Sequence, residues 1–399
     1  MARAMHLDPD LDFIRQVKKA GGADLKTCMQ CATCSVSCKL APPDRPFPRK
    51  EMAMAQWGLK EALLSDPDIW LCHQCNDCST RCPRQAKPGD VLAAVRSMAF
   101  RHYAFPSFMG QALASPAALP LLLLIPALIL LGVLAVGSQG EFGYLFAGSG
   151  EVDYAHAFPH GLLEMLFIGG NLLIFAFAAV GLMRFWNAMK AHTPAGMRSP
   201  GFLAAMTGVA MEILPHSKFG QCGESKPRQL GHLLIFYGFI GAMITAGLAL
   251  FFTIILETLG SPFFLHSPID LPNPIKILGV ASGLAMLIGG GMLISRRLSG
   301  DSVSGYQDWL FLIAITLVGL TGMLAWALRL AEIPVVAYLD YYLHLVLVFF
   351  LLWYAPYSKF AHMFYRTLAL VYARSSGREL VSQAASAAPV APQSKPAAA

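Results

Sequence analysis

Eight of the nine cysteines of this chain lie in two runs that share one spacing. The first run is Cys28-x2-Cys31-x2-Cys34-x3-Cys38, and the second is Cys72-x2-Cys75-x2-Cys78-x3-Cys82 followed by a proline. In two-cluster ferredoxins this spacing holds two iron–sulfur clusters, and the fourth cysteine of each run binds the cluster of the other run. The predicted ligand sets are Cys28, Cys31, Cys34 and Cys82 for one [4Fe-4S] cluster, and Cys72, Cys75, Cys78 and Cys38 for the second.

Two other uses of these cysteines fit the spacing less well. A zinc ribbon needs only two Cys-x2-Cys pairs and would leave two thiols of each run without a role. Thiols two residues apart on a tight loop also suit metal binding better than a disulfide framework. The ninth cysteine, Cys222, lies outside both runs and is expected to be an ordinary loop thiol.

The composition indicates a membrane protein with a soluble N-terminal part. Of the 399 residues, 55% are hydrophobic and only 14% are charged, whereas a soluble domain carries about 25% charged residues. Residues 1–115 contain 15 Lys and Arg against 11 Asp and Glu, and no long apolar run. The first ten residues lack the apolar stretch of a signal peptide, so we expect this part to lie in the reducing cytoplasm.

Six later segments are long and apolar enough to cross a bilayer as helices. They are approximately Ala117–Val136, Gly161–Met183, Leu230–Ile255, Ile275–Ile294, Trp309–Leu328 and Tyr341–Met363. Five would remain if the first lay flat at the membrane surface.

The predicted fold class is therefore all-α. A helical two-cluster ferredoxin domain (1–115) precedes a haem-binding transmembrane bundle (116–370) and a disordered cytoplasmic tail (371–399). Within the ferredoxin domain, helical spacing of apolar residues predicts helices over Arg49–Leu64 and Asp90–Phe100.

Charges in the loops predict the orientation of the bundle. Loop 184–228 carries six Lys and Arg residues, whereas loops 138–159 and 257–274 carry none. Because positive loops stay on the cytoplasmic side, both termini are expected in the cytoplasm. The protein would then be a multi-pass protein of the cytoplasmic membrane.

Four histidines at the ends of these spans are candidate haem ligands. His344 and His362 are 18 residues apart, which on one helix is about five turns and about 27 Å, with both rings on one face. His232 would pair with His362 near the inner surface, and His160 would pair with His344 near the outer surface. Two bis-histidine b haems would carry single electrons. The neighbouring His156 could replace His160, and the inner competitor lies at His216.

Glu164 lies four residues after His160, so the two share a helix face. A carboxyl group inside a membrane is a functional hypothesis by default. Its expected role is to exchange a proton with a quinol or quinone beside the outer haem, with Asp153 and Tyr154 at the border of the same site. The alternative is a carboxylate that only caps the helix N-terminus.

Several longer motifs add a family resemblance that covers about residues 8–370. The segments Pro46-Phe-Pro-Arg-Lys-Glu-Met and Ile69-Trp-Leu-Cys-His-Gln-Cys-Asn-Asp-Cys-Ser lie in the soluble part, and Pro215-His-Ser-Lys-Phe-Gly-Gln-Cys lies in the membrane part. This combination resembles the C subunits of the quinone-interacting membrane-bound oxidoreductases. Such subunits look like a fusion of the cluster and haem subunits of heterodisulfide reductases. Their membrane part is similar to the gamma subunit of respiratory nitrate reductase, although here no second histidine follows His232 by ten residues.

The resemblance implies a complex with two cytoplasmic flavin- and iron–sulfur-bearing subunits, which links menaquinone to adenylylsulfate reductase. The chain itself lacks a dinucleotide-binding glycine motif, and it also lacks the Cys-Cys-Gly repeat of heterodisulfide-cleaving sites. We therefore expect electron transfer without a soluble substrate, and no nucleic-acid partner. The rival interpretations are a heterodisulfide reductase-type subunit and a membrane-anchored zinc scaffold or sensor. The sequence leaves open the direction of electron flow, the quinone and the oligomeric state.

Overall fold

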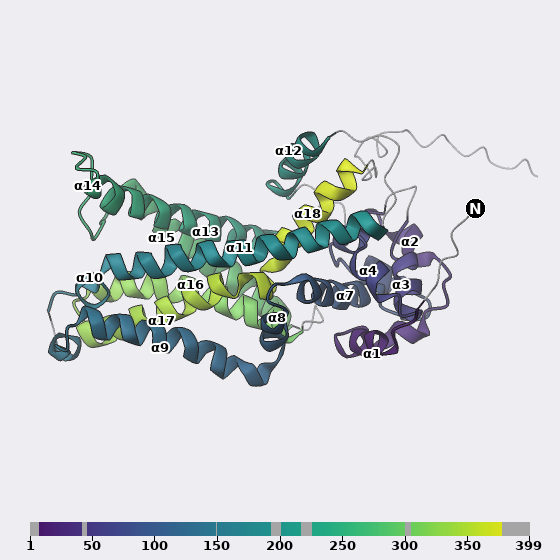
Figure 1. Ribbon diagram of the computed structural model, residues 1–399, viewed down its shortest axis with the longest axis horizontal. Helices are drawn as coiled ribbons and strands as arrows, with labels where there is room; N and C mark the ends of the chain where they lie inside the picture. The colour runs from purple at the N-terminus through teal and green to yellow at the C-terminus, as the bar shows by residue number, and fades with distance from the viewer. Residues whose placement is uncertain are drawn as a thin grey trace, which may run out of the picture. The chain divides into compact units, whose positions relative to one another are not determined.

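The computed structural model describes residues 8–41, 46–148, 150–192, 201–216, 226–299 and 305–376. Within these ranges every regular element is a helix (Figure 1), which confirms the predicted all-α class. Cys222 and most of the predicted tail lie outside the described residues. The chain divides into two compact units, Met1–Met98 with Trp186–Gly223 and Arg366–Ala399, and Ala99–Phe185 with Glu224–Tyr365. The predicted boundaries at residues 115 and 370 stay a prediction.

The first unit consists of short helices around a small apolar core. Its N-terminal elements are α1 (Leu11–Lys19), η1 (Ala23–Thr27), α2 (Thr33–Ser37), α3 (Arg49–Gln56), α4 (Lys60–Leu64), α5 (Asp68–Leu71), α6 (Asp77–Thr80) and the start of α7 (Pro88–Tyr103). Phe13, Leu25, Met52 and Trp70 are almost fully buried in it. The predicted helix Asp90–Phe100 lies within α7. The unit also includes α12 (Phe202–Ile213) and the C-terminal part of α18 (Ala361–Ser375).

The helix predicted over Arg49–Leu64 is in fact two helices, α3 and α4. Gly58 separates them with a φ of +70°, a backbone conformation that L side chains rarely adopt. A β-carbon at this position would lie 2.7 Å from the carbonyl oxygen of Asp10, so a larger residue would also collide with the start of α1. The apolar periodicity was therefore correct, but the glycine ends the first helix.

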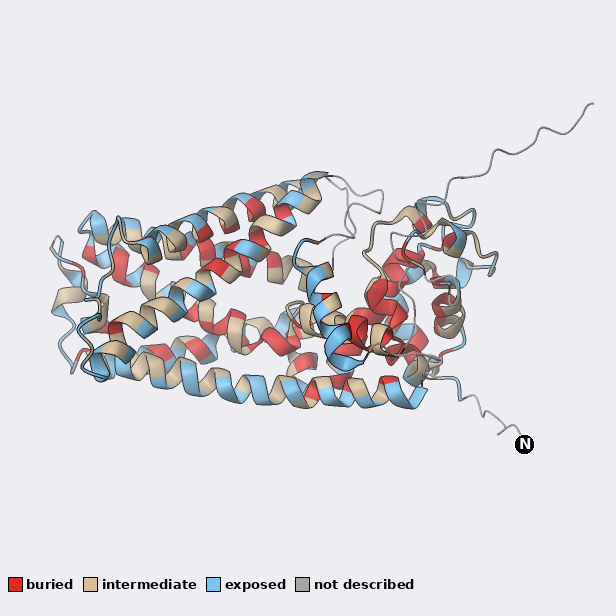
Figure 2. Cartoon of the chain, turned by 90° about the horizontal axis from the view of Figure 1, so that it is seen from above, coloured by how far each residue is buried: buried red, intermediate tan, exposed pale blue. Residues whose placement is uncertain are grey.

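The second unit contains the membrane-spanning helices. Six segments qualify by length and composition, as predicted: Pro116–Gly137, His160–His192, Pro227–Thr258, Pro274–Leu298, Tyr306–Leu330 and Pro334–Trp353. They correspond to η2 and α9 (Leu119–Gly137), α11 (His160–His192), α13 (Lys226–Leu250) continuing through a π-turn into α14 (Leu256–Thr258), α15 (Pro274–Leu298), α16 (Tyr306–Leu330) and α17 (Pro334–Trp353). Helix α15 packs on α13 and α16, and α17 packs on α16 and α9. Exposed and intermediate residues predominate along these helices (Figure 2), as expected for surfaces that face lipid.

The last predicted span, Tyr341–Met363, is wrong at both ends. Helix α17 begins seven residues earlier, at Pro334, where a proline at the first helical position is favourable. It ends at Trp353, before a 3-10 turn that contains Pro356. Proline lacks an N–H and its ring collides with the preceding helical turn, so the helix cannot continue. His362 consequently lies in a separate helix, α18, and the expected single face with His344 does not exist.

Candidate functional site

The two cysteine runs adopt the same backbone conformation. In the first, Gln30 and Ala32 have positive φ angles of 57° and 68°, and in the second, Gln74 and Asn76 have φ angles of 53° and 65°. These residues occupy equivalent positions, and each loop leads into a short helix, α2 or α6. The two short helices contact each other. The two runs therefore form an internal repeat in backbone conformation as well as in cysteine spacing.

The thiols that interact with Cys38, the fourth cysteine of the first run, bear on which of the two clusters it would bind. Burial raises the pKa of Cys38 to about 12, and the thiols of Cys72 and Cys75 act in the same direction. Burial also raises the pKa of Cys78, and two thiols of the first run, Cys38 and Cys34, act in the same direction. Within the first run, burial and then Cys28 raise the pKa of Cys34 to about 11. Thiols of the two runs therefore interact electrostatically, and the assignment of Cys38 and Cys82 to the cluster of the opposite run stays a prediction.

Neutral amides hold the first cysteine loop in place. The Gln56 side chain donates hydrogen bonds to the carbonyl oxygens of Leu25 (3.1 Å) and Cys28 (2.9 Å). It also accepts one at 3.1 Å from Gln30, whose amide lies 3.5 Å from the Cys28 sulfur. This contact network fixes the backbone of the first ligand without placing a buried charge near it.

Two guanidinium groups hold the second loop. Arg96, which is 4% exposed, donates to the carbonyl oxygen of Ile69 at 2.9 Å and to the Gln74 side chain at 3.4 Å. Arg366, from α18, donates to the carbonyl oxygen of Cys72 at 3.0 Å and to Nε2 of His73 at 2.7 Å. The second run therefore has a fixed positive charge directly on the backbone of its first ligand.

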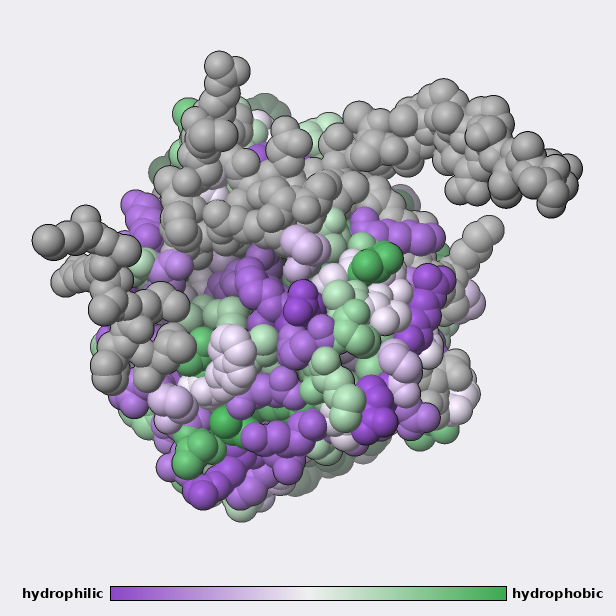
Figure 3. Space-filling model, turned by 90° about the vertical axis from the view of Figure 1, so that its right-hand side faces the viewer, coloured by the Kyte–Doolittle hydropathy of each residue, from purple (hydrophilic) through white to green (hydrophobic). Residues whose placement is uncertain are grey.

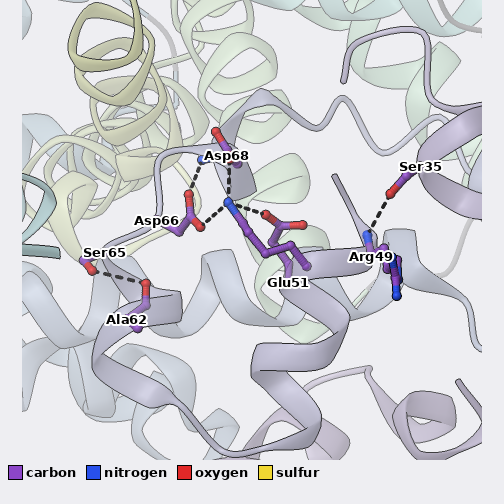
Figure 4. Close-up of polar contacts among 8 residues, drawn as sticks. Ser35, Arg49, Glu51, Ala62, Ser65, Asp66 and Asp68 are labelled. Atoms are coloured by element: carbon purple, nitrogen blue, oxygen red, sulfur yellow. Dashed lines mark hydrogen bonds and ion pairs between the residues drawn. The ribbon is translucent and has the colours of Figure 1, made fainter. Parts of the chain in front are cut away.

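A buried charge cluster connects α3 to the segment that leads into the second run. The Lys50 ammonium lies 2.7 Å from Asp68, 2.8 Å from Asp66 and 3.2 Å from Glu51, and the three carboxylates converge on it (Figure 4). One ammonium cannot neutralise three buried carboxylates. Burial raises the pKa of Glu51 to about 8, and the charges of Asp66 and Asp68 act in the same direction against the opposing effect of Lys50.

The surroundings of His344 suit metal binding. Its Nδ1 lies 2.9 Å from the Thr321 hydroxyl oxygen, and that hydroxyl donates its own hydrogen to the Leu317 carbonyl at 2.8 Å. Both contacts are satisfied when Nδ1 carries the proton, and this tautomer leaves the Nε2 lone pair free for a metal. Gly322 lies against the ring, where a β-carbon would be 3.0 Å from Cε1. His344 is therefore a residue that could hold a metal through Nε2.

The other predicted histidines occur on separate elements. His160 is the first residue of α11 and is exposed, and His156 packs on the Tyr144 ring at 4.4 Å. His232 is near the start of α13, while His362 lies in α18. His216 has Nδ1 at 3.2 Å from the Leu214 carbonyl, and burial lowers its pKa.

Glu164 is one of two acids in the membrane-spanning helices with an unpaired buried oxygen. Its Oε1 has no hydrogen-bond partner among the described residues, and neither does Oδ2 of Asp340. The sequence reasoning missed Asp340 because it started the last span one residue later, at Tyr341. The proline at residue 334, a favoured helix start, was the signal that could have brought Asp340 into the span.

Comparison with known proteins identifies the cysteine-rich segment. Residues 24–86 match the family model of the 4Fe-4S dicluster domain. The C subunit of the H(2):CoB-CoM heterodisulfide,ferredoxin reductase of Methanothermobacter marburgensis is 41% identical over 93 residues, which are 23% of this chain and 49% of that protein. A protein of Archaeoglobus profundus that is like the C subunit of heterodisulfide reductase is 36% identical over 100 residues, 25% of this chain and 53% of that protein. This chain thus spans about half the length of these relatives.

A longer similarity includes the membrane helices. Citrate utilization protein B of Escherichia coli is 27% identical over 322 residues, 75% of this chain and 80% of that protein. The chain therefore combines a 4Fe-4S domain like the C subunit of heterodisulfide reductase with a region like citrate utilization protein B. The dicluster match supports the predicted [4Fe-4S] clusters.

Proposed function

We propose that this protein is the membrane subunit of a quinone-linked oxidoreductase complex and carries single electrons between the bilayer and cytoplasmic partner subunits. The carriers would be two b haems in the helical bundle and two [4Fe-4S] clusters in the first unit. The observation that carries this proposal is that one chain contains both a dicluster domain and six apolar helices. One of these helices contains His344, whose Nε2 is available for a metal.

In the first unit, we propose the ligand sets predicted from the sequence, in which the fourth cysteine of each run binds the cluster of the other run. The electrostatic effect of the Cys72 and Cys75 thiols on Cys38 supports this assignment. The internal repeat extends the same argument to Cys82, because both runs have the same spacing and the same pattern of positive φ angles. When bound, such clusters supply one-electron redox chemistry, and the chain sets their potentials through charge, hydrogen bonds and exposure.

In the bundle, the proposed haem ligands are His160, His232, His344 and His362. His344 has the strongest support, because the Thr321 hydroxyl fixes its tautomer. His362 is still proposed, now as a ligand from α18 rather than from the same helix as His344. Glu164 remains the proposed proton-exchanging residue for menaquinol, supported by its unpaired buried oxygen. The proposed topology keeps both termini on the cytoplasmic side of the inner membrane.

The partners would be two cytoplasmic flavin and iron–sulfur subunits, and through them adenylylsulfate reductase in sulfur metabolism. The relatives named above are subunits of larger reductases, which supports partner subunits in general. The face drawn in Figure 3 has a mixed surface, on which small hydrophobic patches lie between hydrophilic residues. Val36 and Met29, both within the first cysteine run, are 87% and 67% exposed. Apolar side chains so close to a cluster suit a docking surface for an electron-transfer partner.

Metal and haem analysis of the purified full-length protein tests the proposal. We expect about eight non-haem iron atoms per chain, a reduced b-type haem spectrum, and haem reduction by a naphthoquinol. His344→Ala should lower the haem content and leave the non-haem iron unchanged, whereas His192→Ala, at the exposed end of α11, should change neither. A preparation without haem would contradict the quinone-linked function while leaving the dicluster domain intact.

A heterodisulfide reductase-type subunit is the second candidate function, favoured by the heterodisulfide reductase relatives. It would use the same clusters with a different soluble partner. Co-purification from the native membrane distinguishes the two candidates. A heterodisulfide-cleaving partner would support this second candidate, and flavin-bearing subunits together with adenylylsulfate reductase would support the first.

A further inference from the structure

Asp340 is the most deeply buried acidic residue in the described membrane-spanning helices. It is the seventh residue of α17 and therefore lies about 9 Å along the helix from its start. The residue is only 9% exposed, and its Oδ2 has no hydrogen-bond partner among the described residues. Leaving such an oxygen unpaired is unfavourable for stability, so its presence needs an explanation beyond folding.

Two polar groups of the same unit, on Tyr154 and Arg329, already have partners of their own. The Tyr154 hydroxyl donates to the Ala325 carbonyl at 2.7 Å, and the Arg329 guanidinium is bonded to Asp270. Burial raises the pKa of Tyr154, and the Asp340 carboxylate acts in the same direction. The Tyr154 ring stacks on Tyr341 with centroids 4.2 Å apart. Asp340 thus has one oxygen available for a ligand and precedes, in sequence, the tyrosine whose ring stacks on Tyr154.

Asp340 also shares a helix face with His344, because the two are four residues apart in α17. On α16, the Ala325 carbonyl accepts a hydrogen bond from Tyr154, and the Thr321 hydroxyl is hydrogen-bonded to His344 Nδ1. These two are likewise four residues apart, so the antiparallel helices match in register. The Asp340 carboxylate and the His344 imidazole therefore lie one helical turn apart on the same face of α17.

We propose that Asp340 takes one of the two protons that a quinol releases at this interface, in a site bordered by Tyr154 and Tyr341. The proposal rests on the proposed quinone-linked function and adds a second proton acceptor to Glu164. Oxidation of one quinol to the quinone releases two electrons and two protons. One quinol O–H bond breaks as the Asp340 Oδ2–H bond forms, and the other O–H bond breaks as its proton passes to Glu164. The two electrons would pass singly to a one-electron acceptor, and a b haem held by His344 would supply that chemistry. Quinone reduction is the reverse.

The test uses the full-length protein and the isosteric variant Asp340→Asn. Three quantities are measured: haem content by the dithionite-reduced spectrum, the rate of haem reduction by menadiol, and the binding of 2-heptyl-4-hydroxyquinoline N-oxide, followed by its fluorescence. We expect unchanged haem content, at least tenfold slower reduction by menadiol, and about tenfold weaker binding of the quinol mimic. Asp340→Glu should restore part of the rate, because it keeps a carboxylate. Glu257→Gln, which alters an exposed acid of the same unit, should behave like the unmodified protein.

The outcomes separate this inference from the function on which it rests. If the unmodified protein is reduced by menadiol and Asp340→Asn retains both its rate and its binding, the proton-accepting role of Asp340 is overturned. Loss of haem in Asp340→Asn would assign the residue to folding and would also overturn the inference. If the unmodified protein contains haem that menadiol does not reduce, the quinone-linked function itself fails.

Discussion

The two cysteine runs have the same backbone but different surroundings. Each places residues with positive φ at equivalent positions and leads into a short helix. The first loop is held by the neutral amides of Gln30 and Gln56, and the second by the guanidinium groups of Arg96 and Arg366. Arg49 lies near the first run, but its side chain is exposed, so water screens its charge. The comparison teaches that the repeat builds two similar cluster sites, whereas the unrepeated parts of the chain make them electrostatically different.

The largest effect expected is loss of one cluster from a single substitution in the other run. Cys38→Ala should remove the same spin-resonance signal as Cys75→Ala, because the proposed ligand sets assign Cys38 to the cluster of the second run. Cys31→Ala and Cys82→Ala should remove the other signal. Spin-resonance spectra of the reduced full-length proteins distinguish the two patterns. If Cys38→Ala instead removed the same signal as Cys31→Ala, Cys38 would bind the cluster of its own run, and the proposed ligand sets would be wrong.

The buried charge cluster behind the second run predicts a pH-dependent stability. Because the pKa of Glu51 is raised from 4.5 to about 8 in the folded protein, the unfolded chain binds fewer protons between these values. Stability should therefore fall as pH rises from about 4.5 to about 8, by at most about 1.4 kcal/mol per pH unit for one proton. The measurement is urea-induced loss of cluster absorbance at several pH values.

Glu51→Gln isolates this contribution, since a neutral amide cannot titrate. The variant should become less pH-dependent and gain stability relative to the unmodified protein near pH 8. Glu61→Gln, an acid on the exposed surface of α4, should keep the original pH dependence. Identical slopes for the Glu51 variant and the unmodified protein would show that Glu51 is ionised in the folded state.

The first loop should respond to loss of its amide support with a smaller change in stability. Gln56→Ala removes two hydrogen bonds to backbone carbonyls, each worth about 0.5–1.5 kcal/mol, so the expected loss is about 1–3 kcal/mol. Gln16→Ala, an exposed glutamine on α1, is the matched control. Urea-induced loss of cluster absorbance measures both. A change no larger than that of the control would indicate that water replaces the Gln56 contacts.

The cluster sites were the most predictable part of the molecule. Their predicted ligands follow one another within tight loops, so the cysteine spacing predicts which thiols can bind the same cluster. The two copies of the repeat begin at Cys28 and Cys72. The arginines that distinguish the two sites could not be predicted in this way. Arg366 reaches the Cys72 carbonyl from 294 residues away in sequence, a contact that only the tertiary fold creates.

The membrane helices were predicted in number but less well at their ends. The apolar stretch continues past Trp353, so composition extended the last span to Met363, whereas Pro356 ends the helix. That single error placed His344 and His362 on one helix. The predicted start at Tyr341 also left Asp340 outside the span. Helix ends depend on a few backbone-specific residues, and an average over apolar side chains does not detect them.

The smallest effect expected is a shift in redox equilibrium between the two clusters. A positive charge on the Cys72 backbone stabilises the more negative, reduced form of the second cluster. Arg366→Gln should therefore make reduction of that cluster about tenfold less favourable, which is about 59 mV for one electron. The first cluster should keep its potential, because its loop is held by neutral amides. Potentiometric titration followed by spin-resonance spectroscopy measures both clusters in one sample.

Two further variants distinguish charge from structure. Arg366→Lys keeps the charge but loses the forked geometry that bridges Cys72 and His73, so it should retain most of the potential. Arg374→Gln removes a charge from the same helix, where the guanidinium is bonded to Glu212, and should leave both potentials unchanged. Equal shifts of the two clusters in Arg366→Gln would mean that the charge acts on the whole unit. The contrast between an amide-held and a guanidinium-held loop would then have no redox consequence.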